Sequence, residues 1–156
     1  MARRRQPLAS VFLDCPCLDP LCCTASHAEN YNLMPGADWL RWSWAAYLRS
    51  HPDGVKSGLA NGLACPQAQE KPEGPLPPIT LVTALADPLR DEGLAFVETL
   101  RGWGAQVTHF SARSSHCLWS SMDAKATPRI IQHWVSTFQQ HARKWQFAKS
   151  FRVTVI

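Results

Sequence analysis

The chain has 156 residues and a mass of 17.4 kDa, with 46% apolar and 18% charged residues. This length suits one domain with its own core, and the apolar share excludes a chain that is disordered throughout. The net charge of +4 comes mainly from Arg3, Arg4 and Arg5, which mark a basic terminus and not a nucleic-acid-binding face. No apolar run approaches the roughly 18 residues that a membrane-spanning helix needs.

The six cysteines bear on disulfides and on zinc. Four of them are crowded together, as Cys15, Cys17, Cys22 and Cys23. A secreted disulfide protein would begin with a signal peptide and its cleavage site, and this N-terminus does not match that pattern. The spacing of the four cysteines also differs from the two-residue knuckles of ordinary structural zinc sites. We therefore expect free thiols in a reducing, cytoplasmic compartment, with no metal and no other cofactor.

The first half of the chain predicts little regular structure. Residues 1–36 are rich in Pro, Cys and Asn and predict an irregular segment with one apolar stretch over residues 8–13. A helix is predicted from an N-cap at Asp38 through Arg49. Residues 50–78 contain many Gly, Pro, Asn and Ser residues and predict a long surface loop. The helix should bury a broad apolar face made of Trp39, Leu40, Trp42, Ala46, Tyr47 and Leu48.

The second half begins with a short, nearly continuous apolar run over residues 79–85. Such a run is typical of a strand that is buried on both faces in a parallel sheet. A turn follows, and Pro88 has the fixed φ that suits the first position of a helix. That helix should pack one apolar stripe against the sheet and end near Gly102; the stripe consists of Leu89, Gly93, Phe96, Leu100 and Trp103.

A second strand is predicted over residues 106–110, followed by a polar loop over residues 114–117 and a last helix from Thr127. The order strand, helix, strand, helix predicts an α/β fold, with parallel strands joined by a right-handed crossover helix. The structure of residues 148–156 stays open between an extra edge strand and unstructured sequence. The last helix should bury a side made of Ile130, Ile131, Trp134, Phe138, Ala142 and Trp145.

Two titratable residues follow the two predicted strands. Asp87 comes directly after the first strand, and His116 lies in the loop after the second. Parallel strands end at the same edge of a sheet, so the two side chains should meet there. A carboxylate that holds one imidazole nitrogen leaves the other free to act as a base, as in a catalytic triad. Taken singly, Asp87 is interpreted as a helix cap and His116 as a surface histidine. Their pairing favours a catalytic site.

The string D-P-L-R-D-E-G at residues 87–93 lies between a predicted strand and a predicted helix. With the loop histidine that follows, it closely resembles the C-terminal part of the hormone-sensitive-lipase-like, or fold-3, group of α/β-hydrolases. The resemblance extends over about residues 11–140. It implies an incomplete α/β-hydrolase sheet over residues 37–147, with Asp87 as the triad acid and His116 as the triad base. It also implies a small acyl ester as substrate, with no cofactor.

The sequence departs from that family at the nucleophile. A serine in G-x-S-x-G should precede the acid, but the segment 54–58, G-V-K-S-G, has the wrong spacing. Cys117 follows His116, where the family has a small residue. We do not expect Cys117 to replace the serine, because adjacent side chains on one loop seldom point at each other. Without the oxyanion loop as well, the largest electrostatic contribution to catalysis is missing.

Two hypotheses about the function therefore stay open. The first is a fragment of a carboxylic-ester serine hydrolase, which carries the acid and the histidine but no nucleophile and is inactive as this chain. The alternative is a non-enzymatic pseudo-hydrolase or interaction module on the same scaffold. In either case an unpaired edge of the sheet would favour self-association.

Overall fold

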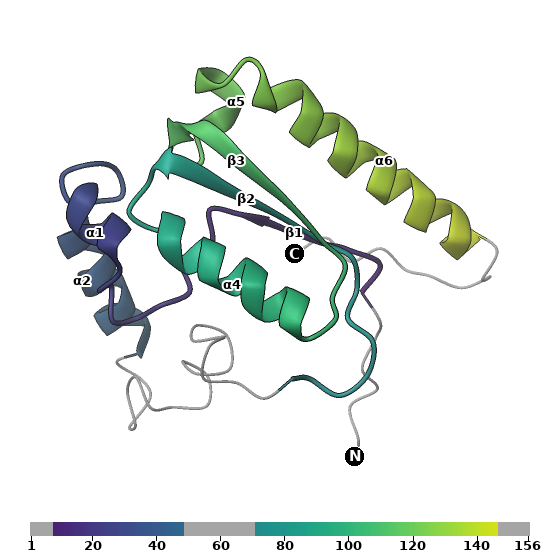
Figure 1. Ribbon diagram of the computed structural model, residues 1–156, viewed down its shortest axis with the longest axis horizontal. Helices are drawn as coiled ribbons and strands as arrows, with labels where there is room; N and C mark the ends of the chain where they lie inside the picture. The colour runs from purple at the N-terminus through teal and green to yellow at the C-terminus, as the bar shows by residue number, and fades with distance from the viewer. Residues whose placement is uncertain (1–7, 49–70, 147–156) are drawn as a thin grey trace.

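The computed structural model describes residues 8–48 and 71–146, and the chain folds around a parallel sheet of three strands in the order β1-β2-β3 (Figure 1). This arrangement confirms the predicted α/β fold with parallel strands and crossover helices. The elements in chain order are β1 (Val11–Asp14), α1 (Ala25–Glu29), α2 (Ala37–Leu48), β2 (Ile79–Ala86), α4 (Arg90–Gly102), β3 (Val107–Ser115), α5 (Trp119–Met122) and α6 (Ala126–Gln146).

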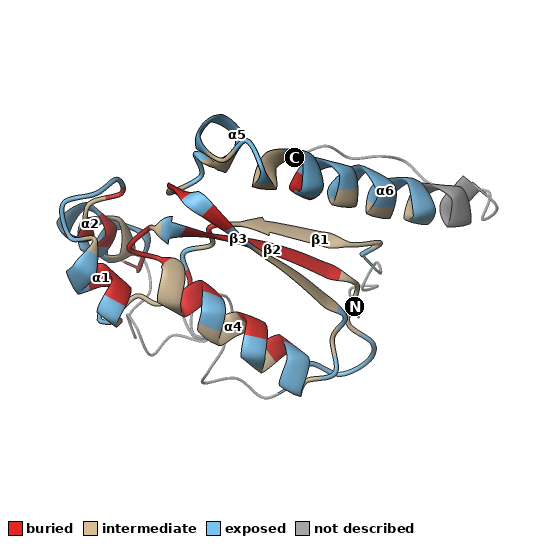
Figure 2. Cartoon of the chain, turned by 45° about the horizontal axis from the view of Figure 1, so that its top comes forward, coloured by how far each residue is buried: buried red, intermediate tan, exposed pale blue. Residues whose placement is uncertain are grey.

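The sheet lies between α4 on one face and α6 on the other (Figures 1 and 2). β2 is the central strand and pairs with a neighbour on each side, so its first six residues are buried. This burial confirms the strand predicted from the continuous apolar run. Leu81 and Thr83 face α4, whereas the Thr80 hydroxyl lies 3.1 Å from Nε2 of His133 on α6. Side chains alternate between the two faces, as strand geometry requires.

α4 packs closely on β2 at Gly93. A Cβ atom added there would lie 2.9 Å from the Thr83 methyl group and 3.8 Å from a Leu81 methyl group. Thr83 has little room to move, because it is buried and its hydroxyl lies 2.9 Å from Nε2 of His109. Gly93 therefore permits the close approach of α4 to the sheet.

We expect Gly93→Ala to lower the free energy of unfolding by up to ~2 kcal/mol, measured by urea denaturation. Overpacking of the interior costs ~1–3 kcal/mol, and the better helix propensity of alanine offsets part of that cost. Gly102→Ala in the same helix is the matched control, because nothing lies within 4 Å of the added Cβ. If both variants changed the free energy of unfolding by the same amount relative to the parent chain, the close contact at Gly93 would be contradicted.

The prediction that residues 1–36 are irregular is wrong over two short stretches. β1, of four residues, pairs in parallel with β2 from Val11 opposite Ile79 onward. α1, of five residues, is held through Ser26 to the start of α4. Both elements are too short to show a periodicity in the sequence, and each depends on a partner more than 60 residues away in the chain.

The predicted burial of two helices is also wrong in part. α2 begins at Ala37, one residue before the expected cap, and buries Leu40 and Leu48, but Trp42 is 63% exposed. On α6, Ile130 is buried while Phe138 is 65% exposed, and Figure 2 shows most of the outward helix surface as exposed. The sheet of three strands, ~10 Å across, covers only the part of the α6 face that lies over it. α2 lies beside the end of the sheet (Figure 1), where Leu40 packs on Cys22 and Leu89. The other exposed members are Trp39, Ala46, Tyr47, Ile131 and Trp134; the side chains of Ala142 and Trp145 lie outside the described residues.

The second predicted strand is confirmed but ends later than expected. β3 extends to Ser115, so the first half of the loop expected over residues 114–117 belongs to the strand. Pairing with β2 continues past an irregularity to Ala86 opposite Ser115, and Ser114 is buried. This extension brings His116 directly to the end of the sheet. The segments 54–58 and 148–156 lie outside the described residues.

Within residues 8–48 and 71–146, no helix is both long and apolar enough to cross a membrane.

Candidate active site

The structure brings Asp87 and His116 together at the carboxyl ends of β2 and β3. Oδ2 of Asp87 lies 3.0 Å from Nδ1 of His116, which is hydrogen-bond distance. The aspartate is 1% exposed, whereas about a quarter of the histidine side chain reaches solvent. The carboxylate thus faces Nδ1 of the imidazole, and Nε2 on the other side of the ring is left for another partner.

The two carboxylate oxygens of Asp87 have separate partners. Oδ1 accepts the backbone N–H of Leu89 at 2.9 Å, in the turn that leads into α4, while Oδ2 faces His116. The backbone carbonyl of Asp87 accepts hydrogen bonds from the side chain of Asn30 and from the N–H of Arg90. A carboxylate held in this way favours the tautomer with a proton on Nδ1, so Nε2 of His116 keeps its lone pair. One oxygen of Asp87 thus caps the turn into α4, and the other lies at hydrogen-bond distance from His116.

Helix α1 anchors the turn that carries Asp87. The Ser26 hydroxyl donates to the carbonyl oxygen of Pro88 at 2.6 Å, and the Ser26 N–H donates to Asp91 at 2.8 Å. Burial raises the pKa of Asp91, but hydrogen bonds from Arg90 and Ser26 outweigh it and hold that pKa below its usual range. Arg90 also forms an ion pair with Glu29 at 2.7 Å, which ties α4 to the end of α1. These contacts explain why a specific string of residues is needed at this turn.

The loop that carries His116 is fixed from the side of β1. The indole N–H of Trp119 donates to Asp14 at 2.9 Å, and the backbone N–H of Cys117 lies 3.4 Å from Sγ of Cys15. Cys15 and Cys117 both have a positive φ, of 43° and 53°, a region that residues other than glycine seldom adopt. Two unusual turns thus face each other across the end of the sheet.

The expectation that Cys117 does not face its neighbour is wrong. Sγ of Cys117 lies 3.4 Å from Nε2 of His116, because the left-handed φ of Cys117 turns the chain back on itself. Burial, together with the charge of Asp14, raises the pKa of the Cys117 thiol. The protonated thiol, a weak nucleophile, is therefore the favoured form.

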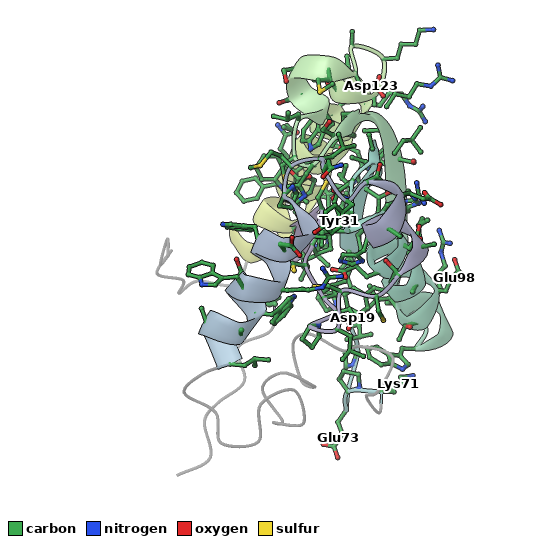
Figure 3. The ribbon with its side chains drawn as sticks, turned by 90° about the vertical axis from the view of Figure 1, so that its left-hand side faces the viewer. Asp19, Tyr31, Lys71, Glu73, Glu98 and Asp123 are labelled. Atoms are coloured by element: carbon green, nitrogen blue, oxygen red, sulfur yellow. The ribbon has the colours of Figure 1, made fainter. Side chains whose placement is uncertain are left out.

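A cavity of about 490 Å³ adjoins the imidazole, between the strand ends and α2. His116 and Leu89 line it from the strand ends, and Trp44 and Tyr47 line it from α2. Figure 3 views the molecule from this side, with Tyr31 in the loop before α2; the Tyr31 hydroxyl donates to Asp38 at the start of that helix. The remaining lining residues are Cys15, Cys17, Pro35, Trp39, Leu40 and Ser43.

The sequence interpretation missed Cys15 and the α2 wall of this cavity. The signal for Cys15 was its position two residues after the apolar stretch 8–13, near where a residue at the end of a strand would lie. Five cysteines of the described residues are free thiols, namely Cys15, Cys17, Cys22, Cys23 and Cys117. Burial is the main reason that the pKa of Cys17 is raised to about 12 and that of Cys22 to about 11.

Comparisons with known proteins find one family model and several solved structures of esterases. A model of the α/β hydrolase fold family matches residues 1–119. A bacterial heroin esterase is 26% identical with a TM-score of 0.71, over 86% of this chain and 43% of that chain. A thermostable esterase from Pseudomonas putida is 23% identical with a TM-score of 0.69, over 81% and 40%. Carboxyl esterase 2 from Tuber melanosporum is 18% identical with a TM-score of 0.71, over 87% and 45%. The chain spans less than half the length of these structures, and no curated protein matches it.

Proposed function

This chain belongs to the α/β hydrolase fold family, in its hormone-sensitive-lipase-like (fold-3) group, and we propose that it carries the acid and the base of a carboxylic-ester hydrolase. Asp87 is the acid and His116 is the base. The observation that carries the proposal is the 3.0 Å contact between a buried carboxylate and a partly exposed imidazole at the carboxyl ends of adjacent parallel strands. The substrate class is a small acyl ester.

The chemistry assigned to the pair follows from its geometry. Nε2 of His116 takes the proton of a nucleophilic hydroxyl as that oxygen attacks the ester carbonyl, and Asp87 stabilises the imidazolium that forms. His116 then gives this proton to the leaving alcohol. In the second half of the reaction His116 takes a proton from water, which attacks the acyl intermediate. His116 then returns this proton to the nucleophile oxygen as the carboxylic acid leaves.

The hydroxyl nucleophile is the missing part of this mechanism. The 156 residues contain no G-x-S-x-G segment, and the chain spans 40–45% of the esterases described above. We propose that this polypeptide is the acid–base portion of a serine hydrolase whose nucleophile lies on sequence outside it. The chain by itself should then have no esterase activity.

The second candidate is a non-enzymatic interaction module on the same scaffold. The exposed aromatic side chains of α2 and α6, Trp42 and Phe138 among them, favour it, because large apolar surfaces often mark protein contacts. Self-association through an edge of the sheet stays a prediction. The genomic sequence upstream of Met1 separates the two candidates: an in-frame G-x-S-x-G favours the hydrolase portion, and its absence favours the module.

We expect the purified chain to hydrolyse p-nitrophenyl acetate or butyrate no faster than the buffer with an equal concentration of free imidazole. Loss of the nucleophile removes ~10⁶-fold in rate from a serine hydrolase, so little should remain. His116→Ala and Cys117→Ser should change this rate less than twofold. Turnover that depends on His116 would show that the chain supplies its own nucleophile, and a burst of p-nitrophenolate lost in Cys117→Ser would identify that nucleophile as the thiol.

A further inference from the structure

Three potential metal ligands meet at the end of the sheet. Sγ of Cys15, a ring nitrogen of His116 and Sγ of Cys117 all lie within 4.8 Å of one another, and Nε2 is the nitrogen that lies beside Sγ of Cys117. Cys15 directly follows β1, and the other two residues directly follow β3, so two separate strand ends supply the ligands. The parallel sheet thus assembles a cluster that the spacing of cysteines along the chain does not reveal.

The spacing of these atoms, within 4.8 Å of one another, is near that of the ligands around one tetrahedral ion, and a small side-chain movement would close the difference. Zinc binds sulfur at ~2.3 Å and imidazole nitrogen at ~2.0 Å, which places neighbouring ligand atoms about 3.5–3.8 Å apart. Cys117 Sγ and His116 Nε2 are already 3.4 Å apart. Sγ of Cys15 lies 3.4 Å from the backbone N–H of Cys117, so this sulfur also faces the loop that carries the other two ligands.

The surroundings of the cluster are those of a metal site. Asp87, which is 1% exposed, holds Nδ1 of His116, so Nε2 is presented to the two sulfurs. A carboxylate behind a ligating histidine is the usual second layer of contacts around zinc. The cavity of about 490 Å³ is lined by Cys15 and His116, and so leaves room for a water molecule or another ligand at a fourth position. Two sulfurs and one imidazole suit zinc and exclude hard ions such as magnesium and calcium.

We propose that Cys15, His116 and Cys117 bind one zinc ion, with the fourth ligand entering from the cavity. Both cysteines bind as thiolates and release their protons to solvent. The ion occupies Nε2 of His116, the same nitrogen that the proposed ester chemistry uses as a base, so the two states exclude each other. The zinc site does not depend on the proposed function, because it needs no nucleophile and no ester.

The test is a titration of the full 156-residue chain, reduced and metal-free, with Co²⁺ as a spectroscopic probe for Zn²⁺. We expect one Co²⁺ per chain, with the d–d absorption of a tetrahedral site and a thiolate-to-cobalt charge-transfer band, and we expect Zn²⁺ to displace it. Cys15→Ser, Cys117→Ser and His116→Ala should each weaken binding by more than ~100-fold. Asp87→Asn acts only through His116 and should cost ~10–100-fold.

Cys23→Ser is the matched control, because this exposed thiol lies outside the cluster and should leave binding unchanged. Cys15 is buried, so circular dichroism must show that Cys15→Ser is still folded. If Cys15→Ser unfolds, the affinity of Cys117→Ser decides the test, because Cys117 is exposed. Three results would overturn the proposal: no saturable uptake of Co²⁺, equal affinity in Cys117→Ser and the parent chain, or loss of binding in Cys23→Ser. If the chain takes up no metal and a Cys15–Cys117 disulfide forms readily, the zinc proposal is wrong and the two cysteines are a redox pair.

Discussion

Glu92→Gln should become steadily more stable than the parent chain as the pH rises from about 4.5 to about 8, by a few kcal/mol at the upper end. Glu92 is 4% exposed, and burial raises the pKa of its carboxyl to about 8, although the Leu18 N–H that donates to it at 2.6 Å acts in the opposite direction. The folded chain therefore keeps a proton that the unfolded chain releases above pH 4.5. The stability from this proton is complete below pH 4.5 and is lost as the pH rises through 8.

Glutamine keeps the carbonyl oxygen that accepts from Leu18 and removes the titration. The measurement is urea denaturation of both proteins at a series of pH values between 4 and 9, compared at each pH. Glu98→Gln is the matched control, since Glu98 lies on the same helix with most of its side chain exposed. Its difference from the parent should stay within about 0.5 kcal/mol throughout.

The neighbour of Glu92 gives this experiment a second possible outcome. Nε2 of His27 lies 3.9 Å from Oε2 of Glu92, and neither atom has a hydrogen-bond partner among the described residues. Burial lowers the pKa of His27 and raises that of Glu92, so the geometry favours two neutral groups over an ion pair. If the pair were charged, Glu92→Gln would destabilise the chain at neutral pH, and the assignment of a protonated carboxyl would be wrong.

The central unit of the fold, β2-α4-β3, could be predicted from the sequence because its patterns are local. The apolar run at 79–85 and the stripe through Gly93 and Leu100 each report burial within one element. The meeting of Asp87 and His116 could be predicted as well, since parallel strands end at a common edge. These statements needed only the order of the elements and the direction of the strands.

The parts that could not be predicted depend on distant partners or on backbone conformation. β1 is four residues long, and only its pairing with β2 identifies it as a strand. The left-handed φ of Cys117 turns its sulfur toward His116, and no sequence pattern signals that conformation in a cysteine. The exposure of Phe138 could not be predicted either, because a helical stripe predicts an apolar face but does not give the width of the sheet beneath it.

Residues 8–146 of this chain should supply a working acid and base when they replace the corresponding part of the bacterial heroin esterase, to which they are similar at 26% identity. In such a chimera the esterase provides the segment that this chain lacks. We expect hydrolysis of p-nitrophenyl butyrate that falls by ~10⁴-fold or more in His116→Ala. Asp87→Asn should cost ~10⁴-fold, because an amide favours the wrong imidazole tautomer.

His141→Ala in the same chimera is the control, because His141 lies late in α6 and away from the strand ends. It should leave the rate within twofold of the chimera. A folded chimera whose rate does not depend on His116 would refute the assignment of the base. Nitrogen NMR on the unaltered chain provides a measurement that needs no chimera: in the neutral ring the 3.0 Å contact places the proton of His116 on Nδ1 and leaves Nε2 without one, and Asp87→Asn should redistribute it. A proton found on Nε2 in the parent chain would leave no lone pair to act as a base, and the hydrolase proposal would lose its mechanism.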